Sequence, residues 1–367
     1  MLNAGNVYKL LDDCSGGFWS PKKILTYGRP VNVVTASRSV GKSTGVAIFA
    51  LGDFLKNGHK FFYVRRRQRD TQKTAKTFFN NAVQIINTKT EYNILGFRAY
   101  RGAYEIALSE KDGKLEWTQC GCYLALSEEE DYKSSVFSEY TLIIYDEFIS
   151  KDPNKYLGTR ETPEREWEAV TSLYQTIDRG VGRPFRNETR IFLLGNKSTI
   201  YNPICLSIGI CDYVMEGARF TAPKGKTWVW EDLNFVVATE KVEESYAYQM
   251  SDSRTRDYAY RNLGKDTKHF IRHPKIARYV NTVKLRGVQY GIMVDDSFTY
   301  YIGSPQAGYH VISLDNESHD GNDLYLIQSW RESPTMMMVS EAYKRGRLFF
   351  INGKIQASFL KYLQFVP

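Results

Sequence analysis

The segment from Ala36 to Ser43 has the residue types of a loop that binds phosphate. It reads Ala-Ser-Arg-Ser-Val-Gly-Lys-Ser, with alanine where such loops usually begin with glycine. Backbone N–H groups in a loop that opens a helix can surround phosphate oxygens, and the positive end of the helix dipole adds to the attraction. We therefore expect Lys42 to reach the β- and γ-phosphates of a nucleotide and Ser43 to bind Mg²⁺. The residues predicted to contact ATP here are Ala36, Ser37, Arg38, Ser39, Val40, Gly41, Lys42, Ser43 and Thr44.

Two carboxylates, Asp146 and Glu147, follow the apolar segment Leu142–Tyr145. A buried strand that ends beside a phosphate loop would place Asp146 next to Mg²⁺, and Glu147 could then orient or deprotonate the attacking water. An acidic pair that only caps a turn is the structural alternative. Because the phosphate loop precedes this pair in the order found in P-loop ATPases, the sequence favours ATP hydrolysis with ATP and Mg²⁺ as cofactors.

Further polar residues stand where they could reach the same nucleotide. Asn196 follows the apolar run Leu193-Leu194-Gly195 and is predicted to contact the γ-phosphate, although Gly-Asn is also common turn chemistry. An arginine that stabilises charge on the transferring phosphoryl group is expected upstream of this run, after a helix that opens at Thr162-Pro163. The candidates for it are Arg179, Arg183, Arg186 and Arg190. An ordinary surface arginine is the alternative for each candidate.

Basic residues are concentrated in two places, within a chain whose formal net charge is +8. One cluster directly follows the second predicted strand. The other lies between residues 251 and 290, a segment that contains ten Lys or Arg and only three Asp. Such clustering indicates a surface for a polyanion, with nucleic acid the obvious candidate, and a solvated basic face is the alternative. The predicted nucleic-acid-binding residues are Arg65, Arg66, Arg67, Arg69, Arg254, Arg256, Arg261, Lys265, Lys268, Arg272, Lys275 and Arg278.

The elements that must position these residues follow a strand, loop, helix, strand pattern, which predicts an α/β fold with a parallel sheet. The predicted strands are 31–35, 60–64, 141–145 and 190–194, and a helix runs over 43–56. A hairpin is expected around 111–114. A helix is expected over 75–86, because its apolar residues recur at helical spacing on one face. A further helix is expected to open at Thr162-Pro163.

These patterns predict an ATPase domain over residues 1–200, a basic linker or lid over 201–287, and a small α/β domain over 288–367. The five cysteines form no CxxC pair, so neither a disulfide framework nor a zinc site is indicated. No run of eighteen apolar residues and no secretory pattern occurs, so we expect a cytoplasmic protein without a membrane partner.

Three segments together resemble the DNA-packaging ATPases of small tailed phages of the φ29 type, which are relatives of the large terminases. They are Tyr-Val-Arg-Arg at 63–66, the arginine-containing loop that ends at Ser43, and Tyr145-Asp146-Glu147-Phe148. The resemblance implies an ASCE-type P-loop ATPase domain followed by a vestigial RNase H-like domain. It also implies a homopentameric ring on the portal of a procapsid, with a packaging RNA, that pumps double-stranded DNA in the host cytoplasm.

The resemblance also assigns roles to single residues. It implies that Arg38 acts in coupling or nucleotide sensing and that Arg179 acts on the ATP of a neighbouring subunit. Lys133 is implied to join Arg179 at the subunit interface, and Arg65 to touch DNA in the pore. The second basic pore position of the family corresponds to Gln68 here, where a basic side chain is missing.

Two other functions share parts of this pattern. A nuclease-active large terminase would need carboxylates that hold two metal ions, and Asp295, Asp296, Asp315, Asp320 and Asp323 are available in the C-terminal region. The first two stand in a predicted turn, where aspartate is common for other reasons. An RNA-binding scaffold that uses ATP only as a structural ligand is disfavoured by Glu147, because binding alone requires no catalytic carboxylate.

Overall fold

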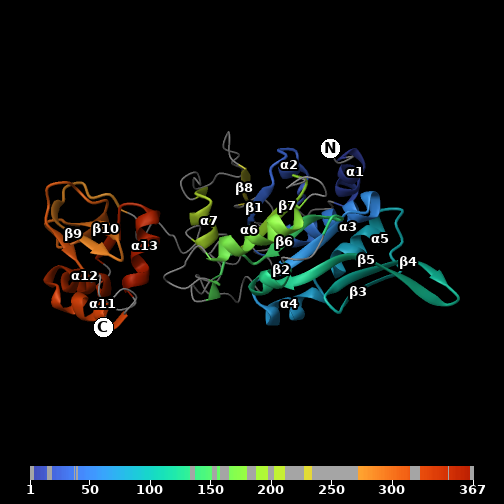
Figure 1. Cartoon of the computed structure of the whole chain (residues 1–367). Coiled ribbons are helices and arrows are strands. Elements are labelled where there is room, and N and C mark those ends of the chain that lie inside the picture. Colours follow the sequence, from blue (N-terminus) through green and yellow to red (C-terminus); the bar gives the residue numbers. More distant parts are fainter. Residues whose placement is uncertain are drawn as a thin grey trace. The chain divides into compact units, whose positions relative to one another are not determined.

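The chain forms two compact units, Met1–Gly264 and Lys265–Pro367, in a computed structural model (Figure 1). The structure describes residues 4–14, 19–36, 38, 40–132, 137–150, 155–157, 165–179, 187–196, 202–210, 227–233, 272–314, 323–345 and 347–363. Each unit has its own hydrophobic core and its own sheet.

The first unit is built on an eight-stranded sheet of order β3-β4-β5-β2-β6-β7-β1-β8. Its strands are β1 Val31–Thr35, β2 Lys60–Arg65, β3 Gly96–Tyr100, β4 Ala103–Lys111, β5 Lys114–Ala125, β6 Tyr140–Asp146, β7 Arg190–Gly195 and β8 Trp228–Asp232. The six strands β5-β2-β6-β7-β1-β8 pair in parallel with their neighbours. Strands β3 and β4 extend the β5 edge of the sheet with antiparallel pairing. The predicted strands and the hairpin are therefore confirmed.

Helices cover both faces of this sheet (Figure 1). The described helical segments of the unit are α1 Ala4–Cys14, α2 Lys22–Leu25, α3 Lys42–Asn57, α4 Gln68–Ala75, α5 Asn80–Lys89, the 3-10 segment η1 Leu126–Tyr132, α6 Arg165–Ile177 and α7 Pro203–Ser207. Helices α1, α3 and α5 bury one face, and α6 with α7 buries the other. The single helix expected over 75–86 is two helices, and the residues Thr162 and Pro163 lie outside the described part.

The first sheet includes a strand from the segment that was expected to be a linker or lid. Strand β8 pairs with β1 along its whole length, from Val31 opposite Trp228 to Thr35 opposite Asp232. This pairing gives the backbone groups on that side of β1 their hydrogen-bond partners. The second unit also begins before residue 288, because its first strand starts at Arg278.

The second unit has a five-stranded sheet of order β12-β9-β10-β11-β13 and three described helices. The strands are β9 Arg278–Leu285, β10 Val288–Val294, β11 Tyr300–Gly303, β12 Val311–Ser313 and β13 Leu348–Phe350. The helices are α11 Asp323–Glu332, α12 Pro334–Lys344 and α13 Gly353–Leu363. Its core includes Trp330, Ile292 and Phe359, in agreement with the small α/β domain expected there.

Candidate nucleotide-binding site

The predicted phosphate loop connects the end of β1 to the start of α3. Gly41 caps the helix with a φ of 86°, a left-handed conformation that glycine adopts without steric strain. The loop is tied down at both ends, because Ala36 N–H donates to Gly195 O at 3.1 Å and Trp19 N–H donates to Val40 O at 3.0 Å. Ser37 and Ser39 lie outside the described residues. The first turn of α3 therefore points its backbone N–H groups toward the same place as the carboxyl ends of β1 and β7.

Lys42 and Asn196, both predicted from sequence to contact the nucleotide, meet at this place. The ammonium group of Lys42 donates a hydrogen bond of 2.6 Å to Asn196 Oδ1. Burial lowers the pKa of Lys42, and the nearby carboxylates of Asp146 and Glu147 oppose that change. A partly desolvated cation at a helix N-terminus is suited to a phosphate group, since it interacts with an anion more strongly than a hydrated cation would.

Asp146 and Glu147 end β6, two strand positions away from β1 in the sheet. Both carboxylates bind one arginine: Arg65 Nη1 lies 2.8 Å from Asp146 Oδ2, and Arg65 Nη2 lies 2.6 Å from Glu147 Oε2. Tyr63 also donates to Asp146 Oδ2 at 3.3 Å. Burial raises the pKa of Asp146, with Arg65 and Lys42 acting in the opposite direction. The side chain of Glu147 remains 61% exposed, so it is accessible to water.

Arg65 and Arg66, both expected from sequence to bind nucleic acid, are buried within the first unit. Both residues belong to β2 or the position directly after it, and each is only 8% exposed. Arg65 is held by Asp146 and Glu147, and Arg66 is held by the buried Glu166, so both guanidinium groups point into the protein. Arg67 and Arg69 are exposed and remain candidates for nucleic-acid contact.

The arginine candidates fall in different places. Arg179 is exposed just after α6, beside Asp178, whose carboxylate accepts hydrogen bonds from the backbone N–H groups of Asn187, Glu188 and Thr189. Burial alone would raise the pKa of Asp178, but these hydrogen bonds outweigh it and lower the pKa. Sequence reasoning missed this anchor, although an aspartate directly after a helix was visible. It fixes the backbone next to Arg179.

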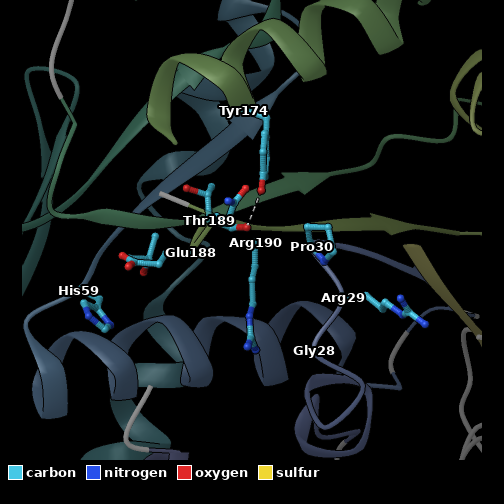
Figure 2. Close-up of a pocket in the computed structure, with 10 residues that line it drawn as sticks. Gly28, Arg29, Pro30, His59, Tyr174, Glu188, Thr189 and Arg190 are labelled. Atoms are coloured by element: carbon cyan, nitrogen blue, oxygen red, sulfur yellow. Dashed lines mark hydrogen bonds between the residues drawn. The ribbon is translucent and has the colours of Figure 1, made fainter. Parts of the chain in front are cut away.

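Arg190 begins β7 and therefore lies at the amino ends of the parallel strands, whereas the phosphate loop follows the carboxyl end of the neighbouring strand β1. There it lines a cavity of about 470 Å³ together with Gly28, Pro30, His59 and Tyr174 (Figure 2). Figure 2 shows Arg190 directed toward the helix below the sheet, and Tyr174 OH donates to Thr189 O at 3.1 Å above it. This position rules Arg190 out as a residue that reaches its own subunit's phosphate loop, because the length of a parallel strand lies between them.

Several predicted residues are not described by the structure. They are Lys133, Arg183, Arg186, Arg254, Arg256, Arg261, Lys265 and Lys268. Arg38 is exposed in the phosphate loop, and Arg272, Lys275 and Arg278 are exposed in the second unit. Among the described residues, no helix is long and apolar enough to cross a membrane.

The strand order and the site together define a P-loop NTPase of the ASCE class, in which β7 separates the phosphate-loop strand β1 from the carboxylate-bearing strand β6. The sequence matches the family described as Podovirus DNA encapsidation protein (Gp16) over residues 13–364. The chain belongs to this family of phage DNA encapsidation proteins.

Known proteins resemble the chain over nearly its whole length. The DNA packaging protein of Bacillus phage phi29 is 25% identical over 356 residues, which cover 92% of this chain and 95% of the relative. That of Bacillus phage B103 is 24% identical over 338 residues, covering 90% of this chain and 95% of the relative. These matches confirm the predicted class, a phage DNA-packaging ATPase.

Two solved structures share the fold. The bacteriophage Phi-29 viral genome packaging motor assembly contains a chain that matches with a TM-score of 0.64 and 21% identity, covering 96% of this chain and 100% of that one. The Phi-28 gp11 DNA packaging motor matches with a TM-score of 0.56 and 17% identity, covering 95% and 98%. The predicted fold class is therefore confirmed.

Proposed function

We propose that this chain hydrolyses ATP bound between Lys42, Asn196, Asp146 and Glu147, and that the hydrolysis drives double-stranded DNA into a procapsid. The observation that carries the proposal is the meeting of these four side chains at the carboxyl ends of β1, β6 and β7, although they are far apart in sequence. Lys42 would bind the β- and γ-phosphates. Glu147, exposed and one residue beyond Asp146, would accept the proton of the attacking water.

The residues present also fit Mg²⁺. Ser43 follows Lys42 in the first turn of α3, and Asp146 supplies a carboxylate at the end of β6. Mg²⁺ prefers oxygen ligands and is usually bound by one or two protein groups, substrate phosphates and water. No cluster of three or more His, Cys, Asp or Glu side chains occurs among the described residues, which agrees with a metal held largely by the nucleotide. The metal, when bound, would offset charge on the phosphates.

The larger assembly follows from the same family likeness. We infer a ring of subunits, with a pentamer as the expected size, mounted on a procapsid portal with a packaging RNA in the host cytoplasm. The phi29 and Phi-28 structures that share the fold are packaging motors, which supports a multisubunit motor. Arg179 lies just after α6 at an exposed position, which supports its action on a neighbour's ATP. Lys133 is proposed to join it at that interface.

The second unit is proposed to bind nucleic acid or the procapsid rather than to cut DNA. Asp295, one of the carboxylates considered for cleavage, accepts hydrogen bonds from the N–H groups of Ser297 and Thr299 and from the hydroxyls of Ser297 and Tyr301. These bonds lower the pKa of Asp295 to about 2 although burial acts in the other direction. A carboxylate used in this way stabilises a turn, so the nuclease alternative gains no support from it. An RNase H-like origin of this unit remains a proposal.

The test is ATP turnover by the full chain with and without double-stranded DNA and procapsids. Glu147→Gln should bind ATP nearly as well as the wild type and should stop turnover, because the amide keeps the shape but cannot accept a proton. Lys42→Ala should weaken binding itself. Wild-type turnover by Glu147→Gln would remove Glu147 from the mechanism, and a wild-type chain without any turnover would remove the proposed function.

A further inference from the structure

The segment Glu147–Phe148 is held from both faces of the sheet by two consecutive arginines. Neighbouring residues at the end of a strand point to opposite faces. Arg65 binds the side-chain carboxylates of Asp146 and Glu147 on one face. Arg66 reaches the backbone on the other, where its Nη2 donates to Phe148 O at 2.7 Å and to Glu147 O at 3.4 Å. The position of the catalytic carboxylate thus depends on a side chain that does not touch it.

Arg66 is itself fixed by a buried acid. Its Nε donates to both oxygens of Glu166, at 3.0 and 2.9 Å, and its Nη2 donates to Glu166 Oε1 at 2.8 Å. Glu166 is 0% exposed, in the first turn of α6. It also accepts hydrogen bonds from Tyr145 OH at 2.6 Å and from Leu157 N–H at 3.0 Å. We call Arg66 and Glu166 the clamp.

Aromatic rings complete the surroundings of the clamp. The guanidinium carbon of Arg66 lies 4.7 Å from the ring centre of Tyr156 and 5.9 Å from that of Tyr145. The hydroxyl of Tyr156 accepts from Ser150 N–H at 2.9 Å, three residues after Glu147. The clamp therefore joins β2, the segment after β6 and the start of α6. Buried ion pairs often stabilise a fold no better than apolar residues of equal size, so such a network calls for another explanation.

The backbone of Glu147 supplies that explanation. Its φ is 56°, a left-handed conformation that a residue with a side chain rarely adopts. Such a conformation persists only where the surroundings determine it. Around Glu147 they do so on both sides, because Arg66 binds the carbonyl groups of residues 147 and 148, and Phe148 N–H donates to Leu194 O at 3.2 Å. The left-handed turn aims the carboxylate.

We propose that Arg66 and Glu166 are positioning residues for hydrolysis, which hold Glu147 in its left-handed conformation and anchor it to the first turn of α6. The inference rests on the proposed function, since it gives Glu147 the role of activating water. Without the clamp the Glu147–Phe148 carbonyls would have no charged donor, and the carboxylate would sample other directions. Misplacement of a reacting group by about 1 Å can lower a rate about 100-fold.

The experiment compares two double variants of the full chain, assayed with DNA and procapsids. Arg66→Met/Glu166→Met replaces the clamp by apolar side chains of similar length, a change that often preserves stability. The matched control is Arg165→Met/Glu129→Met. It removes a second ion pair at the start of α6, with Arg165 Nη2 2.8 Å from Glu129 Oε1, that makes no contact with Glu147 or Phe148. Each variant is measured for melting temperature, ATP affinity, kcat and KM.

We expect the clamp variant to fold but to melt below the wild type, because Tyr145 OH and Leu157 N–H lose their acceptor Glu166. It should bind ATP with unchanged affinity, while kcat falls about 100-fold and KM stays constant. The control should keep its kcat. An unchanged kcat in the clamp variant, or an equal decrease in the control, would overturn the proposal. Should the clamp variant fail to fold, Tyr145→Phe removes only the 2.6 Å bond to Glu166 and should lower kcat severalfold; wild-type kcat there would also overturn the proposal. A wild type without turnover would instead remove the proposed function.

Discussion

Arg65 and Asp146 lie side by side at the ends of the neighbouring strands β2 and β6, with 2.8 Å between Nη1 and Oδ2. The contact places a permanent positive charge beside the carboxylate proposed to bind Mg²⁺. Contact with DNA in a central channel was the role expected for Arg65 from sequence. Its guanidinium instead binds both carboxylates of the proposed hydrolytic site.

The first prediction tests this place for Arg65. Arg65→Gln removes a cation that repels Mg²⁺ at short range, so the Mg²⁺ concentration for half-maximal turnover should fall severalfold. The maximal rate should also fall, because the carboxylate of Glu147 no longer has its partner at 2.6 Å. The matched control, Arg67→Gln, changes an exposed arginine two positions later. A Mg²⁺ titration and a DNA-binding assay separate the two roles. Weakened DNA binding with an unchanged Mg²⁺ requirement would show that Arg65 contacts DNA and does not act in hydrolysis.

The second prediction is that Arg179 acts on the ATP of a neighbouring subunit. Arg179→Ala should bind ATP normally and hydrolyse it about 10³ to 10⁵ times more slowly, because an arginine finger stabilises charge that appears in the transition state. Mixing Arg179→Ala with Glu147→Gln subunits should restore part of the turnover, since some interfaces then pair an intact Arg179 with an intact Glu147. Full activity of Arg179→Ala alone, or no recovery on mixing, would move the role to Arg183 or Arg186.

The third prediction concerns the exposed basic residues Arg272, Lys275 and Arg278 at the start of the second unit. If they bind phosphates, replacing all three by Ala should flatten the dependence of log affinity on log salt by about 0.9 for each phosphate of double-stranded DNA that is no longer neutralised. Lys111 and Lys114, exposed on the β4–β5 hairpin, provide the control. An equal slope in both variants would make the basic residues an ordinary solvated surface.

The fourth prediction is a pH dependence of stability that originates from Glu231 on β8. Burial raises the pKa of Glu231 from 4.5 to about 7, against the effects of a hydrogen bond from Trp19 and the charge of Lys23. Because the folded state favours the protonated acid, this contribution is fully present below pH 4.5 and is lost as the pH rises through 7. It amounts to as much as about 3 kcal/mol.

Glu231→Gln should therefore flatten the stability profile between these pH values and raise stability at pH 8. Denaturant unfolding at pH 5 and pH 8 measures the effect. Glu188→Gln, which changes an exposed glutamate, serves as the control. Equal pH profiles for wild type and Glu231→Gln would show that Glu231 is not the titrating group.

The parts predicted correctly from sequence depend on local patterns. The phosphate loop, the strands that flank it and the carboxylates at the end of β6 are each contained in a few consecutive residues, and the parallel sheet brings their ends together. Lys42 and Asn196 were each expected near the nucleotide. Their direct hydrogen bond was not predicted, and it forms because the loop after β1 and the end of the adjacent strand β7 lie side by side.

The parts that were missed depend on distant partners. Arg65 and Arg66 look the same in sequence as the exposed Arg67 and Arg69, and their partners Glu147 and Glu166 are 82 and 100 residues away. The predicted strand 60–64 stops one residue before the observed end of β2 at Arg65, so both arginines were assigned to the loop after it. Likewise, nothing local in Trp228–Asp232 shows that this strand pairs with β1, which lies far earlier in the chain.

The pairing of β8 with β1 also bears on how the chain is made. A ribosome adds roughly 5–20 residues per second, so about 2 to 7 s pass between the emergence of Gly195 and that of Asp232. During this interval β1 has β7 on one side and an open edge on the other. That edge carries Val31, Val33 and Val34, residues suited to pairing with the wrong strand. The strand that leads into the phosphate loop is thus exposed to aggregation in a nascent chain, and slower translation after residue 195 would lengthen the exposure.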